Sequence, residues 1–448
     1  MSSTMIQGPT VPELAAGNVL AAAMLAEARA RTLLLIASVT EEDLRRQHDP
    51  LMGPILWDLG HIAHFEELWL LRNLEGEIRF SEMPGMFNPF EHPRAVRGAL
   101  ELPTLAQTLA HMAETRARVL AALDAADFGS DNPLLRAGYV YHMVAQHEYQ
   151  HGETMLQTLQ LKQGAPYHAP RAIVFPEVPG RGIDTASMVR FPGGTVRIGT
   201  HDRRTAYDNE RPEHEVELKP FAIDVAPVTN AHFLEFMADG GYARPELWTE
   251  PGRAWLAESG AQAPRYWVQQ EGEWHRRVMD RSTPVAAAAD HPVIHVSAHE
   301  ADAYARWAGK RLPTEAEWEA AACWDSAAGA RRDYPWGDEA PSPLHANVDQ
   351  LAFDTAPVGT FGRNVSPLGC YGMIGDAWEW TATTFTGYPG FEAFPYPEYS
   401  QVFFGDEYRV LRGGSWATRS GAIRGSFRNW DYPIRRQIFS GFRCARDD

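Results

Sequence analysis

The sequence has few cysteines: Cys323, Cys370 and Cys444 are the three in 448 residues, and no two of them form a C-x-x-C pair. An odd and sparse count excludes a small disulfide-stapled secreted scaffold and is typical of a reducing cytoplasm. The chain also lacks an apolar run near the roughly 18 residues that a membrane span requires. Its first residues, MSSTMIQGPTVPEL, lack the basic and then apolar pattern of a signal peptide. We therefore expect a cytoplasmic protein that does not associate with membranes.

Basic residues are in a minority, with 41 Lys and Arg against 58 Asp and Glu, and the formal net charge is -17. The acidic excess is spread along the chain instead of forming a tail. It excludes nucleic acid as a partner, because phosphate binding needs a basic footprint. The hydrophobic share of 44% and the length are sufficient for two globular domains.

Residues 1–165 have the apolar spacing and the end signals of helices. Four long helices are expected, at about 12–38, 55–73, 104–126 and 132–163, with Asn132 and Pro133 at the start of the fourth. Thr40 and Asp43 have the spacing of a helix N-cap with an acidic third position. Four such helices with modest connections predict an antiparallel four-helix bundle.

The chain changes character after the fourth helix. Residues 166–186 are rich in Pro and Gly without periodicity, which predicts a linker. Residues 187–448 alternate short apolar segments with turns, which predicts a loop-rich second domain and an α+β protein of two domains. The elements expected there are strands Met188–Phe191, Val196–Gly199 and Glu215–Leu218, and helices at about 230–239, 298–308 and 314–322, the last with Thr314 and Glu317 in capping-box spacing.

The strongest chemical signal is HEYQHGE, residues 147–153, inside the fourth expected helix. His147 and His151 are four residues apart, so a helix places both imidazoles on one face, where they can share a metal ion. A third ligand must come from another helix, and WDLGHIAHFEE in the second expected helix contains both His61 and His64. Glu153 is a further candidate, although it lies about 200° around the helix from His151.

Seven motifs together resemble the ergothioneine-type sulfoxide synthases. They are WDLGH, HEYQHGE, RLPTEAEWE, YPWGD, GDAWEWT, RGGSW and FRNWDYPIRRQIFSGFR, and the resemblance extends from about Asp49 to Arg443. It implies an N-terminal DinB-like four-helix bundle joined to a C-type-lectin-like domain of the formylglycine-generating-enzyme kind.

The resemblance implies a non-haem iron(II) enzyme that uses O2 to join a thiol to C2 of the imidazole of hercynine, Nα-trimethylhistidine, as a sulfoxide. The implied Fe(2+) ligands are His61, His147 and His151, with His61 chosen over His64 and with Glu153 outside the ligand set. The residues implied to bind hercynine are Gln150, Asn429 and Trp430.

The thiol donor implied by the resemblance is γ-glutamylcysteine or cysteine, whose carboxylates require arginines. The matching positions are Arg94, Arg97 and Arg435, with Asp431 for the ammonium group. A tyrosine is expected to supply a proton near the iron, and the register favours Tyr396, although Pro395 and Pro397 depart from the family pattern. Tyr399 and Tyr388 are the alternatives.

Three other functions are compatible with parts of the sequence. A selenoneine synthase would share the iron and hercynine residues but join a selenosugar through a C–Se bond, and it would not need the three arginines. A formylglycine-generating enzyme needs a pair of reactive cysteines near the C-terminus, where Cys444 stands alone. A DinB-like bundle can also serve as a non-catalytic binding module.

Overall fold

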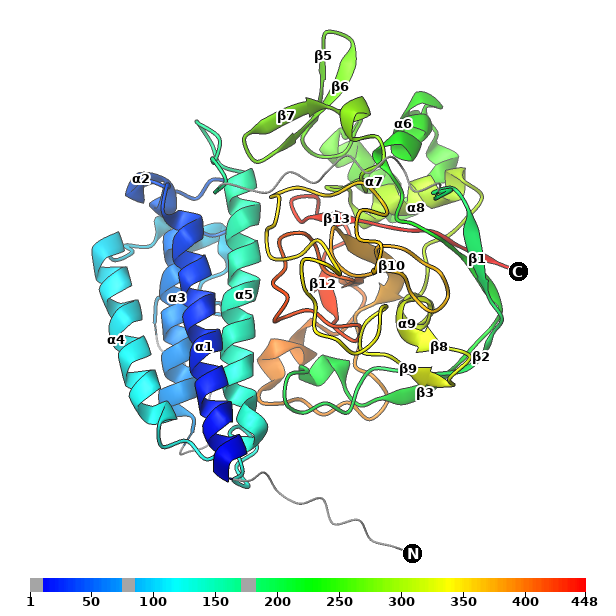
Figure 1. Cartoon of the computed structure of the whole chain (residues 1–448). Coiled ribbons are helices and arrows are strands. Elements are labelled where there is room, and N and C mark those ends of the chain that lie inside the picture. Colours follow the sequence, from blue (N-terminus) through cyan, green and yellow to red (C-terminus); the bar gives the residue numbers. More distant parts are fainter. Residues whose placement is uncertain (1–10, 75–84, 171–182) are drawn as a thin grey trace, which may run out of the picture. The chain divides into compact units, whose positions relative to one another are not determined.

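A computed structural model describes residues 11–74, 85–170 and 183–448 of the chain (Figure 1). The chain forms two compact units. The first comprises Met1–Ala165 together with two short later segments, Asp202–Tyr207 and Ala393–Tyr399, and the second comprises the rest. In the described part of the chain, every helix is too short or too polar to cross a membrane.

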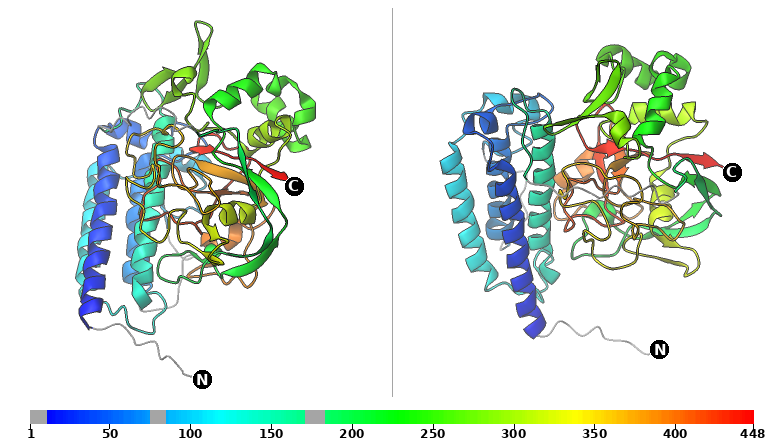
Figure 2. Two further views of the ribbon diagram at one scale, coloured as in Figure 1. Left: turned by 45° about the vertical axis from the view of Figure 1, so that its right-hand side comes forward. Right: turned by 45° about the horizontal axis from the view of Figure 1, so that its top comes forward.

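Four long helices build the first unit, as the apolar spacing predicted: α1 Val11–Ile36, α3 Ile55–Glu67, α4 Leu105–Leu123 and α5 Tyr139–Gln160. They lie side by side in both views of Figure 2, where α1 packs against α5, and α3 packs against both α4 and α5. A short helix, α2 Glu41–Arg45, joins α1 to α3. The predicted four-helix bundle is confirmed.

Side-chain caps determine where several of these helices begin. The Thr40 hydroxyl accepts a hydrogen bond from the Asp43 amide at the start of α2, as predicted. Thr104 and Gln107 form a reciprocal capping box at the start of α4. Helix α3 starts directly after Pro54, and a π-helical turn at Leu68–Arg72 prolongs it.

The predicted start of the fourth helix, at Asn132 and Pro133, is wrong. The Asn132 side chain caps only a turn, in which its Oδ1 accepts from the Leu134 amide at 2.9 Å. Ala137 and Gly138 then have φ values of 54° and 75°, which a right-handed helix does not allow. Helix α5 therefore begins at Tyr139, because this left-handed pair separates the turn from the helix.

The second unit is built from small sheets and hairpins. Two three-stranded sheets have the orders β1-β4-β14 and β5-β6-β7, a four-stranded sheet has the order β12-β11-β10-β13, and two-stranded sheets are formed by β2-β3 and β8-β9. The strands are β1 Met188–Phe191, β2 Gly194–Ile198, β3 His214–Leu218, β4 Phe221–Asp224, β5 Trp267–Gln270, β6 Glu273–Val278, β7 Arg281–Pro284, β8 Trp324–Asp325, β9 Ala330–Arg331, β10 Trp378–Thr384, β11 Arg409–Arg412, β12 Asn429–Asp431, β13 Ser440–Gly441 and β14 Ala445–Asp447.

Four helices accompany these strands: α6 Asn230–Ala238, α7 Glu250–Ser259, α8 Ala298–Trp307 and α9 Glu315–Cys323. Three were predicted, and the predicted capping box of Thr314 and Glu317 is present at α9. Helix α7 was missed because Pro251 and Gly252 in its first turn resemble a turn signal. The Thr249 side chain accepts from the Gly252 amide. The available start signal was therefore a capping threonine with a proline two residues later.

Buried ion pairs brace the core of the second unit. Arg428 and Arg412 both donate to Glu315 on α9, from Nε at 2.7 Å and from a terminal guanidinium nitrogen at 2.8 Å. Strand β12 pairs with β11 so that Trp430 lies opposite Val410 and Asn429 opposite Leu411. These contacts place Asn429–Asp431 on the edge of the four-stranded sheet, directly after the buried Arg428.

Candidate metal centre

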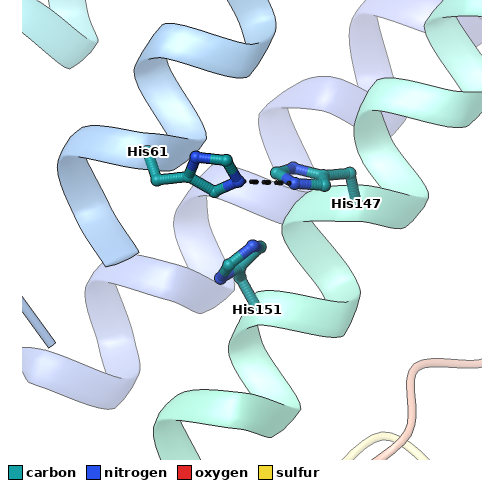
Figure 3. A group of neighbouring side chains, drawn as sticks. All are labelled: His61, His147 and His151. Atoms are coloured by element: carbon teal, nitrogen blue, oxygen red, sulfur yellow. Dashed lines mark hydrogen bonds between the residues drawn. The ribbon is translucent and has the colours of Figure 1, made fainter. Parts of the chain in front are cut away.

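Three histidines from two helices of the first unit converge on one point (Figure 3). His61 comes from α3, and His147 and His151 come from α5. One ligand nitrogen of each lies within 4.8 Å of the others, and the Nε2 atoms of His61 and His147 are 3.2 Å apart. The i, i+4 spacing on α5 supplies two of the rings, and the packing of α3 against α5 supplies the third.

The two other candidate ligands lie outside this group. His64 follows His61 by three residues on α3, and its buried Nε2 makes no hydrogen bond within the described residues. Glu153 is buried on α5 but offers no ligand atom to the cluster. The described part of the site is therefore all imidazole.

Burial controls the charge of the cluster. Removal from water, reinforced by the neighbouring imidazoles, holds the pKa values of His61 and His147 well below the usual range of histidine. Both rings are therefore neutral at physiological pH. Neutral imidazoles have a free lone pair, which is the form that binds a metal.

Hydrogen bonding sets the tautomer of His61. The Phe87 carbonyl lies 2.8 Å from His61 Nδ1, and a carbonyl can only accept, so Nδ1 carries the proton. The Nε2 lone pair of His61 consequently faces the other two rings. Asp58 Oδ1 lies 3.3 Å from His151 Nδ1, in ion-pair range but outside hydrogen-bond geometry.

Aromatic side chains stack on two of the three rings. Phe65 stacks on His147 with 3.6 Å between ring centres, and Trp57 stacks on His61 at 4.9 Å. Tyr396, from the segment Ala393–Tyr399, is 5% exposed and stacks on Trp69 with 4.9 Å between ring centres. It meets Phe65 edge-on, with 6.5 Å between ring centres. Of the three candidate tyrosines, Tyr396 is thus brought close to the rings that cover His147.

Two tyrosines hold the amide of Gln150, which lies between the ligands in sequence. Tyr207 donates its hydroxyl to Gln150 Oε1 at 3.2 Å, and Gln150 Nε2 donates to the Tyr399 hydroxyl at 3.3 Å. The two phenol rings stack at 4.2 Å, and burial raises the pKa of Tyr399 well above its usual value. Sequence reasoning missed Tyr207, because no local motif marks it and only the tertiary fold brings Asp202–Tyr207 to α5.

The two arginines predicted for the donor in the first unit differ in exposure. Arg97 is 6% exposed, its guanidinium carbon lies 3.5 Å from the centre of a Trp57 ring, and its Nε donates to the His92 carbonyl at 2.8 Å. Burial lowers the pKa of Arg97 to about 10, although Asp58 opposes the shift. Arg94 is exposed at the start of the turn Arg94–Ala99.

The remaining predicted site residues lie in the second unit. Asp431 and Arg435 pair with each other at 3.3 Å, and Trp430 stacks on Phe385 at 4.1 Å. The side chain of Asn429 accepts from the Trp430 amide at 2.9 Å. Tyr388, the other alternative to Tyr396, donates to Glu315 in the buried ion-pair network.

The donor set fits a divalent first-row transition metal. Imidazole nitrogens suit iron, zinc, copper and nickel, and a set of three imidazole ligands leaves open positions for substrate or oxygen. A closed structural zinc site would require a fourth protein ligand. The cluster therefore has the chemistry of a catalytic metal centre.

Comparisons with known proteins agree with this description. Residues 24–155 match the DinB superfamily, and residues 174–448 match the sulfatase-modifying factor enzyme 1-like domain. The chain is 34% identical to the formylglycine-generating enzyme of Streptomyces coelicolor, over 62% of this chain and 95% of that protein.

Relatives that cover nearly the full length include two hercynine oxygenases. The hercynine oxygenase of Mycolicibacterium thermoresistibile is 44% identical over 95% of this chain and 94% of its own. That of Mycobacterium tuberculosis is 43% identical over 94% of this chain and 97% of its own. These full-length matches, with both family matches in one chain and a three-histidine cluster in the first unit, place this protein among the hercynine oxygenases, which makes it a metal-dependent and oxygen-dependent oxidoreductase.

Proposed function

We propose that the protein is a non-haem iron(II) sulfoxide synthase that joins a thiol to C2 of the hercynine imidazole. The observation that carries this proposal is the cluster of His61, His147 and His151, the first two buried and neutral, in a chain that matches hercynine oxygenases over almost its whole length. The three imidazoles would hold Fe(2+), and iron(II) supplies the redox chemistry that activates O2.

The electron balance of this reaction needs no other reductant. Hercynine loses the C2 hydrogen, the thiol loses its S–H hydrogen, and one C–S bond forms. The sulfur then gains one oxygen atom, and the second oxygen atom leaves as water. O2 accepts all four electrons, so one O2 should be consumed per product, which is a measurable stoichiometry.

Gln150, Asn429 and Trp430 are the residues that we propose for hercynine. A trimethylammonium group cannot donate hydrogen bonds, so aromatic faces and acceptor oxygens recognise it best. The hydrogen bonds from Tyr207 and to Tyr399 support this role for Gln150, because they hold its side-chain amide next to the proposed ligands His147 and His151. The stack of Trp430 on Phe385 keeps that indole in a defined orientation.

Arg94, Arg97, Asp431 and Arg435 are the residues that we propose for a γ-glutamylcysteine donor. Guanidinium groups bind carboxylates through paired hydrogen bonds, and the carboxylate of Asp431 suits an ammonium group. The pair between Asp431 and Arg435 would have to exchange partners when a zwitterionic donor binds.

Tyr396 is the residue that we propose as the proton donor. A tyrosine hydroxyl is protonated at neutral pH and can release a proton to a developing charge. The stack of Tyr396 on Trp69 and its edge contact with Phe65, which covers His147, support this choice over Tyr388.

The test is oxygen uptake by the full-length protein loaded anaerobically with Fe(2+). With hercynine and γ-glutamylcysteine we expect one O2 per product, and a product mass equal to both substrates minus two hydrogens plus one oxygen. Cysteine and a selenosugar replace the donor in parallel reactions. Turnover with the selenosugar alone would show a C–Se bond-forming synthase, and no uptake with any donor would refute the proposal.

Two histidine variants make the test specific to the proposed ligands. His61→Asn should abolish uptake and Fe(2+) binding, because it removes one of three ligands. His64→Asn, a matched change three residues away on α3, should retain Fe(2+) binding. Loss of binding in His64→Asn but not in His61→Asn would contradict the ligand assignment.

A further inference from the structure

The segment 85–97 is hydrogen-bonded to helix α3 through two consecutive backbone carbonyls. The Met86 carbonyl accepts from Trp57 Nε1 at 2.8 Å, and the Phe87 carbonyl accepts from His61 Nδ1 at 2.8 Å. Trp57 and His61 are four residues apart, so both donors lie on one face of α3, where the rings stack. The segment therefore contacts the histidine directly and also the ring that supports it.

Gly60 gives the segment its close approach to α3. A Cβ atom at residue 60 would lie 2.2 Å from two atoms of the Phe87 ring, a distance that real Cβ contacts do not reach. Glycine inside a helix is destabilising relative to alanine, so its place here needs a local reason. That reason is the Phe87 ring, which rests where a side chain would otherwise be.

Hydrogen bonds within the segment also hold its conformation. Asn88 is 2% exposed. Its backbone N–H donates to the Gly85 carbonyl at 3.0 Å, and its side-chain Oδ1 accepts from the backbone N–H of Phe90 at 3.0 Å. At the far end, Arg97 donates to the His92 carbonyl and lies over Trp57. Such a loop holds its carbonyls in fixed positions.

We propose that residues 85–97 form a positioning strap that sets the tautomer and ring orientation of His61, with Gly60 and Phe87 as the positioning residues. The inference rests on the proposed role of His61 as a metal ligand. A hydrogen bond to the distal nitrogen of a ligating histidine fixes its orientation and increases its basicity, and losing such a partner typically weakens metal binding by about 10- to 100-fold.

Co(II) binding to the metal-free full-length protein tests the strap without any turnover. Gly60→Ala should displace the Phe87 ring and with it the carbonyl, so the Kd for Co(II) should rise about 10-fold or more and the visible Co(II) spectrum should change. The double variant Gly60→Ala/Phe87→Ala removes the clashing ring and should recover part of the affinity lost in Gly60→Ala. This rescue is a result that general destabilisation would not produce.

Helix α5 offers a matched control. Gly152 directly follows the proposed ligand His151. A Cβ atom at residue 152 would clash with nothing, because it would meet only Leu35 Cδ1, at 3.8 Å. Gly152→Ala should leave the Co(II) affinity and spectrum unchanged. An equal loss of affinity in Gly152→Ala and Gly60→Ala would overturn the strap, since any added methyl beside a ligand would then have the same effect.

A further variant decides the question if Gly60→Ala does not fold. Trp57→Phe keeps an aromatic ring at position 57 but deletes the hydrogen bond to the Met86 carbonyl, and it should weaken Co(II) binding several-fold with an altered spectrum. Unchanged affinity and spectrum in the folded strap variants would refute the strap. Absence of Co(II) binding by the wild-type protein would instead refute the metal centre.

Discussion

At the scale of single residues, burial decides which histidines stay neutral. His295 in the second unit is 2% exposed, and its Nδ1 donates to the Arg436 carbonyl at 3.1 Å. Burial lowers its pKa to about 3, with Arg265 and Arg277 contributing in the same direction. The ring is therefore a neutral structural group.

The lowered pKa of His295 predicts an acid-dependent stability. The imidazole of His295 binds a proton near pH 6.5 in the unfolded chain but only near pH 3 in the folded chain. The stability that neutral His295 contributes is therefore complete above pH 6.5 and decreases as the pH falls towards 3. The loss is about 1.4 kcal/mol per pH unit, or about 2 kcal/mol between pH 6.5 and 5.

Urea unfolding of the wild type and of His295→Asn between pH 7 and 5 measures this effect. Asparagine tolerates the positive φ of 67° at position 295 and cannot titrate, so the variant should have the shallower pH dependence. Groups common to both proteins cancel in the comparison. Parallel pH profiles for the two proteins would contradict the prediction.

At the scale of elements, each long helix contributes one charge to a buried ion cluster in the bundle. Arg29 from α1 lies 2.7 Å from Glu66 of α3 and 2.8 Å from Glu148 of α5. Arg116 from α4 completes the cluster, 2.5 Å from Glu66 and 3.3 Å from Glu148. The cluster is electrically balanced and lies beside the site in sequence, because Glu148 follows His147.

Removing one member of this cluster should be costly. Glu148→Gln leaves two buried guanidinium groups with one carboxylate, and loss of one partner of a buried pair typically costs about 3–5 kcal/mol. The free energy of unfolding from denaturant titration measures this. Glu42→Gln, in the exposed pair with Arg46, is the control and should change stability little. Similar small effects in both variants would show that the buried cluster contributes no more than a surface pair.

At the scale of the whole molecule, metal binding and folding should be coupled. A ligand that binds only the folded chain stabilises it by about 2.7 kcal/mol at a free concentration one hundred times its Kd. Anaerobic Fe(2+) should therefore raise the unfolding temperature of the full-length protein, and a chelator should reverse the increase. His147→Asn should remove the shift, whereas His64→Asn should keep it. A shift that persists in His147→Asn would place the stabilising metal elsewhere.

The residue pattern was sufficient to predict the long helices, the two-domain α+β fold and the placement of His147 and His151 on one helix face. These are local properties, because apolar period, capping side chains and an i, i+4 pair need only neighbouring residues. The start of α5 was not predictable in this way, since the left-handed conformation of Ala137 and Gly138 overrides the capping signal at Asn132.

Alone, the sequence determined that one helix would carry two histidines on one face, with the spacing of metal ligands, and that a second helix held further candidates, His61 and His64. Residue spacing left the choice between these two open, although the family resemblance implied His61. The tertiary structure turns His61 into the cluster and leaves His64 outside it, because of how α3 packs against α5 and because of the Phe87 carbonyl. Likewise only the fold brings Tyr207, Tyr396 and Tyr399 to the bundle, across chain separations that no local pattern records.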